Sequence, residues 1–136
     1  MAVYTELSDE EIAAFVASYD LGAVHACKGI AEGVENSNYL LVTDGGTFIL
    51  TVYERRVREQ ELPFFLDLLE YLARRNVPCP TPLRGRDGRV LRRVRERIAA
   101  IVTFLPGLWP RRPTPEQCAA LGAALAVTLV AGGMLL

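Results

Sequence analysis

A glycine-bearing segment near the N-terminus has the residue types of a loop that could hold phosphate. The predicted loop runs from Gly29 to Ser37, carries a second glycine at Gly33 and follows Lys28. Glycine allows close approach of the backbone, and successive backbone N–H groups can cradle phosphate oxygens. Two glycines between strands are equally typical of a structural turn. The residues alone therefore leave phosphate binding and a plain turn both open.

Two carboxylates lie in the same predicted loop, at Glu32 and Glu35. Negative side chains repel phosphate, so we expect them to point outward, or to contact a cation or a substrate amine. His25 is the only histidine, and no acid or serine motif accompanies it nearby in the sequence. We therefore expect His25 to be an ordinary strand residue rather than a catalytic base.

Composition places the chain among ordinary globular proteins. Of 136 residues, 51% are hydrophobic and 23% are charged, which suits one modest core. The net charge of -1 gives no field for nucleic acid or an anionic membrane. Three cysteines without a C-x-x-C pair favour free thiols in a reducing compartment, and residues 1–8 lack the pattern of a secretory signal. We therefore expect a cytoplasmic protein.

Local patterns predict an α+β domain. A capping box from Ser8 to Glu11 begins a helix over 9–19, and a second helix with an apolar stripe of Leu62, Phe65, Leu66, Leu69 and Leu72 ends near Asn76. The predicted strands are 21–28, 38–43, 47–53, a stretch near 90–94 and 98–105. The result is an antiparallel sheet of about five strands, with one helix inserted after the third.

Arginines crowd the stretch between the second helix and the last strand. This set comprises Arg84, Arg86, Arg89, Arg92, Arg93, Arg95 and Arg97. An exposed hairpin edge explains such charges, because edge strands commonly carry cations that discourage pairing with other chains. An anion-binding patch is the alternative.

The C-terminal region is apolar. A linker at 106–113 leads to a helix that begins with Thr114 as its N-cap and Pro115 at its first position. Residues 118–136 carry no charge and approach the length of a membrane span. Glycines interrupt this segment, so a core helix deprived of its partner is favoured over a membrane anchor. Such a helix predicts self-association or aggregation.

Several longer stretches resemble bacterial homoserine kinases of the aminoglycoside-phosphotransferase-like superfamily. These stretches are 28–41, 48–54, 62–66, 77–82 and 99–107, in the order that the family shows. The resemblance runs from about 1 to 126. It implies the small lobe of a protein-kinase-like fold, divided into a nucleotide-binding lobe at 1–105, an interlobe hinge at 106–113 and the start of a second lobe at 114–136.

The resemblance also implies an activity, namely phosphorylation of the homoserine hydroxyl by ATP with Mg²⁺, a step of threonine biosynthesis. It implies ATP contacts from Lys28, Gly29, Ile30, Ala31, Glu32, Gly33, Asn36, Ser37, Thr51, Thr103, Phe104 and Leu105. ATP and homoserine are thus the expected small-molecule partners. Another small-alcohol acceptor such as choline, or a non-catalytic binding module, remains an alternative.

Two departures from the family pattern matter. Kinase-like lobes place a cation on the third strand, whereas this chain has Thr51 there; Lys28, Arg55 or Arg56 could supply the charge, with Glu59 or Glu61 as its partner. The family's catalytic aspartate and magnesium ligands lie further downstream, and no such motif follows Thr114. Residues 131–136 look like a shifted reading frame or premature stop. We therefore expect this chain not to turn over by itself.

Overall fold

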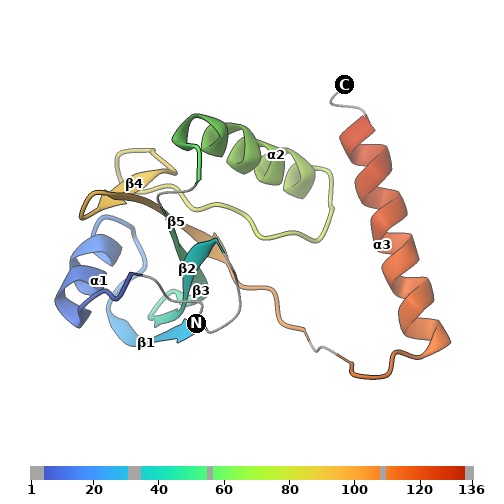
Figure 1. Ribbon diagram of the computed structural model, residues 1–136, viewed down its shortest axis with the longest axis horizontal. Coiled ribbons are helices and arrows are strands. Elements are labelled where there is room, and N and C mark those ends of the chain that lie inside the picture. Colours follow the sequence, from blue (N-terminus) through green and yellow to red (C-terminus); the bar gives the residue numbers. More distant parts are fainter. Residues whose placement is uncertain (1–4, 31–34, 55–56, 108–109, 134–136) are drawn as a thin grey trace.

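A five-stranded antiparallel sheet is the centre of the fold, which was analysed as a computed structural model (Figure 1). The structure describes residues 5–30, 35–54, 57–107 and 110–133. Its elements are α1 (Asp9–Val16), β1 (Val24–Ile30), β2 (Asn36–Thr43), β3 (Gly46–Tyr53), a 3-10 turn η1 (Glu59–Glu61), α2 (Leu62–Arg74), β4 (Arg92–Val94), β5 (Arg97–Thr103) and α3 (Pro115–Gly133). The strand order is β1-β2-β3-β5-β4. The α+β prediction is confirmed.

Helix α1 covers one face of the sheet. The predicted capping box begins it: the Ser8 hydroxyl accepts from the Glu11 N–H at 3.3 Å, and the Glu11 carboxylate accepts from the Ser8 N–H at 2.8 Å. Alternate strand residues face the helix, and Leu41, Leu50 and Ile101 are completely buried there. The helix ends before the predicted Tyr19, but this ring still packs in the core. Burial raises the pKa of Tyr19 to about 12.

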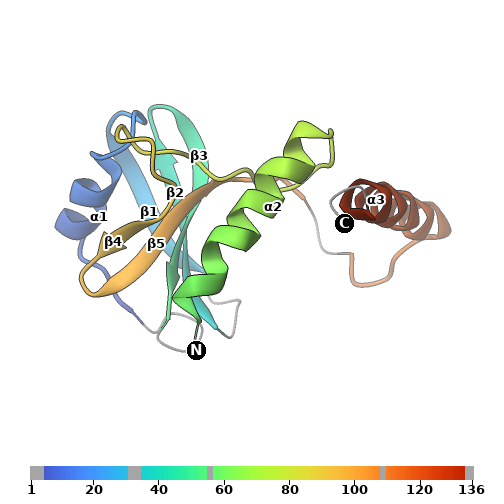
Figure 2. The same cartoon turned by 90° about the horizontal axis from the view of Figure 1, so that it is seen from above.

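Helix α2 lies on the opposite side of the sheet from α1 (Figure 2). Its buried residues are Leu62, Leu66 and Leu72. The predicted stripe was wrong at Phe65, which is 52% exposed and packs edge-on against the exposed ring of Phe64. The apolar face of α2 is therefore wider than the surface that the sheet covers.

The β1–β2 connection is shorter than predicted. Strand β1 continues through Gly29 and Ile30, which pair with Tyr39 and Asn38, and β2 already begins at Asn36. The first strand also begins later than predicted, because Gly22 has a φ of 74° and the Asp44 carboxylate accepts from the Ala23 N–H at 2.7 Å. The extension of β1 comes from its pairing with β2, which the pattern of one strand does not contain, whereas its late start follows from the backbone conformation at Gly22 and the contact of Ala23 with Asp44.

The arginine-rich stretch forms the β4 edge of the sheet, as predicted. Its charges are largely neutralised by carboxylates, through the pairs Arg84–Glu70 at 2.8 Å, Arg92–Asp87 at 2.6 Å, Arg93–Glu59 at 3.2 Å, Arg95–Glu11 at 2.5 Å and Arg97–Glu54 at 2.5 Å. Arg95 adopts a φ of 53° in the turn between β4 and β5. This stretch is therefore a network of ion pairs rather than a bare anion patch.

Helix α3 stands apart from the sheet (Figures 1 and 2). The predicted cap is present: the Thr114 N–H donates to the Gln117 side chain at 2.8 Å, and the Gln117 N–H donates to the Thr114 hydroxyl at 3.3 Å. Ala131 is its one buried residue among those described, and it packs with Leu72 and Val77. With a mean hydropathy of 1.3, α3 is long and apolar enough to cross a membrane, but length and composition alone are a weak indication.

Candidate nucleotide-binding site

The face of the sheet opposite α1 carries several of the predicted site residues in adjacent rows. Strand register places Lys28, Leu40, Ile49 and Val102 in one row across β1, β2, β3 and β5. The next row contains Ile30, Asn38, Thr51 and Ala100. Paired residues present their side chains on the same face of a sheet. The lysine, the third strand and the strand before the hinge therefore share one surface.

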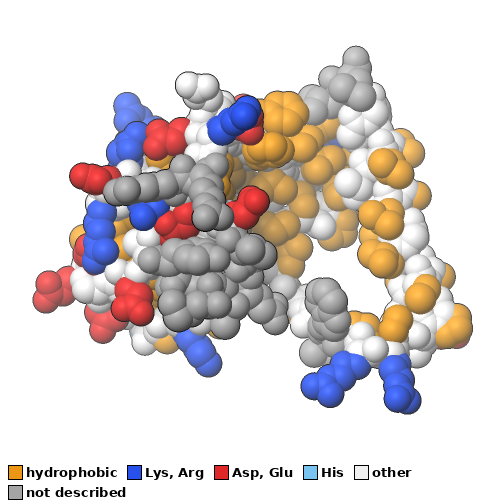
Figure 3. Space-filling model, viewed as in Figure 1, with side chains coloured by type: hydrophobic (Ala, Val, Ile, Leu, Met, Phe, Trp, Pro, Cys, Tyr) orange, Lys and Arg blue, Asp and Glu red, His pale blue; other side chains and the backbone are white. Residues whose placement is uncertain are grey.

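The apolar part of this surface is only partly covered. Leu40, Ile49 and Val102 are half-buried, although they lie in inner strands of the sheet. Figure 3 shows hydrophobic side chains gathered on the side of the body that faces α3, across an open gap. Half-buried aliphatic side chains on a rigid sheet suit a flat, apolar ligand ring.

Thr51 is hydrogen-bonded to Asn38, a residue that was not among the predicted site residues. Its hydroxyl donates to the Asn38 Oδ1 at 2.9 Å, directly across β2 and β3. Two neutral polar groups therefore stand where a kinase-like lobe carries a cation. The two-residue period of the strands could have identified Asn38, because it falls on the same face as Lys28 and Leu40.

Lys28 is the one cation in these two rows of described residues across β1, β2, β3 and β5. It is exposed, and no ion pair joins it to another described residue. It is also the only lysine of the chain. The alternative cations Arg55 and Arg56 lie outside the described residues. The carboxylates expected to pair with such a cation contact other arginines: Glu59 pairs with Arg93, and Glu61 pairs with Arg58.

The residues of the predicted loop have different environments in the structure. Gly29, Ile30 and Asn36 are strand residues rather than loop residues. Ser37 is completely buried, and its hydroxyl donates to Glu54 at 2.6 Å and accepts from the Thr5 N–H at 3.0 Å. Ala31, Glu32 and Gly33 lie outside the described residues, whereas Glu35 is exposed. The Ser37 side chain therefore stabilises the fold, and this geometry does not support a role for its hydroxyl in ligand binding.

At the end of β5, the backbone hydrogen bonding stops after Thr103. The Thr103 N–H donates to the Thr81 carbonyl and the Thr103 hydroxyl accepts from the Thr81 N–H, both at 2.9 Å. Phe104 and Leu105 are 41% and 46% exposed, and no backbone hydrogen bond joins them to another described residue. Free backbone N–H and C=O groups need partners, which water or a hydrogen-bonding heterocycle can provide.

His25 lies at the other end of the sheet, near the β2–β3 turn. It has an acidic partner after all, because its Nε2 lies 2.5 Å from the Asp44 Oδ1. The pKa of Asp44 is lowered mainly by the hydrogen bond from the Ala23 N–H and then by His25. Val24, next to His25, pairs with Thr43 at the end of β2. The His25–Asp44 pair therefore lies far along the strands from Thr51 and belongs to the β2–β3 turn.

The described residues do not provide a magnesium centre by themselves. No group of three His, Cys, Asp or Glu side chains among them is placed to hold a metal ion. Magnesium in kinases is held by carboxylate or amide ligands together with the phosphates. The polar groups in the two rows of this face are an amine, an amide and a hydroxyl, so they suit phosphate oxygens better than a cation.

The chain belongs to the phosphotransferase enzyme family, whose pattern it matches over residues 26–131. It is 60% identical to a homoserine kinase of Rhodospirillum rubrum over 133 residues, which are 98% of this chain and 41% of that protein. It is 60% identical to the homoserine kinase of Paramagnetospirillum magneticum and 59% identical to that of Acidiphilium cryptum, over 97% of this chain in each case. The chain spans about 40% of the length of these relatives.

Proposed function

We propose that this chain forms the nucleotide-binding lobe of an ATP-dependent homoserine kinase of threonine biosynthesis, acting in the cytoplasm. The observation that carries the proposal is the 60% identity to a homoserine kinase over 98% of the chain. The family membership supports phosphoryl transfer as the reaction class. The proposed division is a lobe at 1–105, a hinge at 106–113 and the beginning of a second lobe at 114–136.

The geometry supports a specific arrangement of ATP. The adenine ring would lie on Leu40, Ile49 and Val102, with the exposed backbone of Phe104 and Leu105 as its hydrogen-bonding edge. Lys28 would hold a phosphate by its charge, beside the Asn38–Thr51 pair. The remaining predicted contacts, at Gly29, Ile30, Ala31, Glu32, Gly33 and Asn36, belong to the β1–β2 connection and its flanks. They complete the proposed site.

The chemistry requires groups that this face does not present. Phosphoryl transfer needs a carboxylate that orients the acceptor hydroxyl, and ligands for the magnesium ion that neutralises the phosphates. The residues of the two rows on this face would bind and orient the nucleotide, but none of them is a carboxylate. We therefore expect the chain alone to bind MgATP without phosphorylating homoserine.

Titration calorimetry of the purified chain with MgATP tests this function, together with a phosphorylation assay on homoserine and, for comparison, choline. Binding without turnover is the expected result. A folded chain that binds no nucleotide would contradict the proposal, and turnover of choline alone would contradict the acceptor.

The lone lysine allows a sharper test of the site. An amine-reactive ATP analogue should label Lys28, and excess ATP should prevent the labelling. Lys28→Met should weaken ATP binding by roughly tenfold, because it removes one charge-assisted contact to phosphate. Arg58→Met is the matched control, since Arg58 is 80% exposed and its partner is Glu61. Equal affinities of the two variants would remove Lys28 from the site.

A further inference from the structure

Glu54, directly after β3, is a largely buried junction between four segments of the chain. Its Oε1 accepts from the Ser37 hydroxyl at 2.6 Å and from the Thr5 hydroxyl at 2.7 Å. Its Oε2 lies 2.5 Å from the Arg97 Nη1. One carboxylate thus joins the N-terminal segment, the start of β2, the end of β3 and the start of β5.

The burial of this junction distinguishes it from the other ion pairs. The Glu54 side chain is 10% exposed and that of Arg97 is 24% exposed, whereas the side chains of the Arg93–Glu59 pair are 60% and 55% exposed. Exposed pairs contribute little because water screens them, but removing one partner from a buried hydrogen-bonded group is costly. The geometry at Glu54 is therefore firmly held.

The junction lies beside the polar row of the proposed site. Asn36 pairs with Tyr53 and Ser37 pairs with Val52, so Glu54 closes the β2–β3 ladder at the end where β2 begins. Asn38 follows Ser37 directly and bonds Thr51 across the same ladder. A shift of one residue in the pairing of β2 with β3 would place Asn38 on the other face of the sheet, because side chains alternate along a strand.

We propose that Glu54 is a positioning residue that fixes the register at the start of β2 and thereby presents Asn38 and Thr51 to the nucleotide. The proposal rests on the proposed function, since it assumes that this face receives ATP. It assigns Glu54 no contact with the ligand. Its effect passes through Ser37 to the neighbouring residue of β2.

The test compares Glu54→Ala with the matched control Glu59→Ala, measuring MgATP affinity of the folded protein by calorimetry and amide hydrogen exchange over 36–39. We expect Glu54→Ala to weaken binding by about tenfold and to speed exchange, because the site loses preorganisation. Glu54→Gln should restore part of the affinity, since its amide oxygen still accepts from Ser37 and Thr5. Glu59→Ala should change neither quantity.

The outcomes separate this inference from the proposed function. If Glu54→Ala lowers only the melting temperature and binds MgATP as tightly as Glu59→Ala, the positioning role is refuted. Should Glu54→Ala not fold, Ser37→Ala keeps the Glu54–Arg97 pair and is expected to weaken binding by about threefold. If the unmodified chain binds no MgATP, the proposed function fails. Exchange over 36–39 then decides about the register: faster exchange in Glu54→Ala supports the part of the proposal in which Glu54 fixes the start of β2, and unchanged exchange refutes it.

Discussion

The sheet with α1 and helix α3 use similar apolar residues to opposite effect. Leu50 of β3 is 0% exposed, whereas Leu129 of α3 is 75% exposed. The core residues of β3 contact partners from the neighbouring strand β2 and from β5 and α1, which are distant in the sequence. Helix α3 has its cap and its local hydrogen bonds, but it touches the rest of the described chain mainly through Ala131.

This difference teaches that the two regions owe their structure to different causes. An amphipathic element becomes stable by burying its apolar face, and a helix that is apolar on all sides ordinarily lies inside a protein. The sheet with α1 meets that condition within this chain, but α3 does not. The two regions should therefore respond differently to the same kind of change.

The largest expected effect on stability comes from shortening a core side chain. Leu50→Ala should lower the free energy of unfolding by about 3 kcal/mol, because it leaves a cavity between the sheet and α1. Leu125→Ala, at a position 55% exposed on α3, should change it by less than about 0.5 kcal/mol. Urea unfolding of both variants measures the contrast. Equal losses would mean that α3 is as firmly packed as the sheet.

Removing the C-terminal region tests whether the sheet is independent of it. A chain ending at Leu105 should keep a cooperative unfolding transition, with its midpoint within about 5 °C of the full chain. It should also self-associate less in sedimentation experiments, because the exposed apolar side chains of α3 are gone. Loss of the transition would show that α3 supports the sheet, contrary to the comparison.

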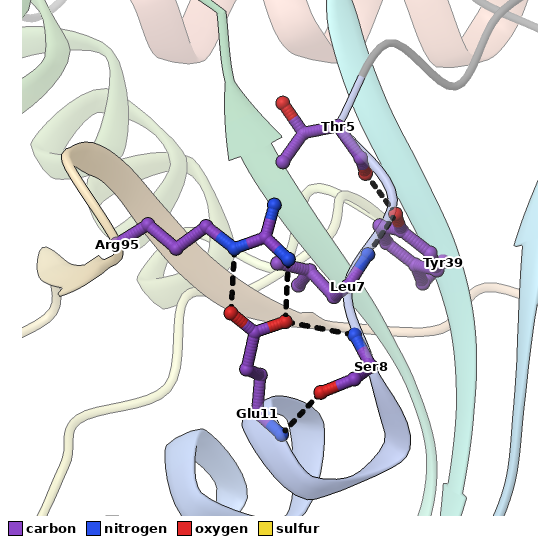
Figure 4. A network of polar contacts seen from close by, with 6 residues as sticks. All are labelled: Thr5, Leu7, Ser8, Glu11, Tyr39 and Arg95. Atoms are coloured by element: carbon purple, nitrogen blue, oxygen red, sulfur yellow. Dashed lines mark hydrogen bonds and ion pairs between the residues drawn. The ribbon is translucent and has the colours of Figure 1, made fainter.

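A smaller effect is expected from the pair that joins α1 to the β4–β5 turn (Figure 4). Hydrogen bonds from Arg95 and from the Ser8 N–H lower the pKa of Glu11 from 4.5 to about 2. The ionised Glu11 carboxylate therefore makes its full contribution to the free energy of unfolding above pH 4.5, and this contribution is lost as the pH falls toward 2. Melting temperatures of the parent and Glu11→Gln should differ at pH 7 and converge near pH 2. A constant difference across this range would exclude the ionised carboxylate as its source.

The smallest effect concerns reactivity rather than stability. Burial raises the pKa of the Cys27 and Cys79 thiols, while Cys118 on α3 is exposed. A thiol reagent should therefore modify Cys118 first, because access and thiolate content set the rate. In Cys118→Ser the fast phase should disappear with no change in unfolding. A fast phase that persists would place a reactive thiol in the sheet region.

Predictions from sequence succeeded where the cause was local. The Ser8–Glu11 capping box and the N-cap at Thr114 both act within a few residues, and both were predicted. Predictions failed where a partner was distant. Ladder pairing carried β1 through Gly29 and Ile30, and only the tertiary structure joins Arg95 to Glu11 and Arg97 to Glu54.

In the candidate site, too, local features were predicted and contacts between strands were not. Lys28 and Thr51 were identified from their place in the sequence, and strand register brings them to one face. The bond from Thr51 to Asn38 and the burial of Ser37 depend on which strands become neighbours, which the residue pattern of one strand does not specify. The assignment of ATP contacts remains a prediction.

The double hydrogen bond between Thr81 and Thr103 has a mechanical consequence. Residues 81–83 follow α2 and run beside the C-terminal end of β5, which pairs with β3 on its other side, so the chain toward α3 departs from a strand end held on both sides. A torque applied through α3 would therefore be transmitted to β5 and the segment after α2 at one anchor, while α1 lies on the far side of the sheet. The first residues beyond this anchor, Phe104 and Leu105, have no backbone hydrogen bond to another described residue, so the fixed geometry of the strand ends at Thr103.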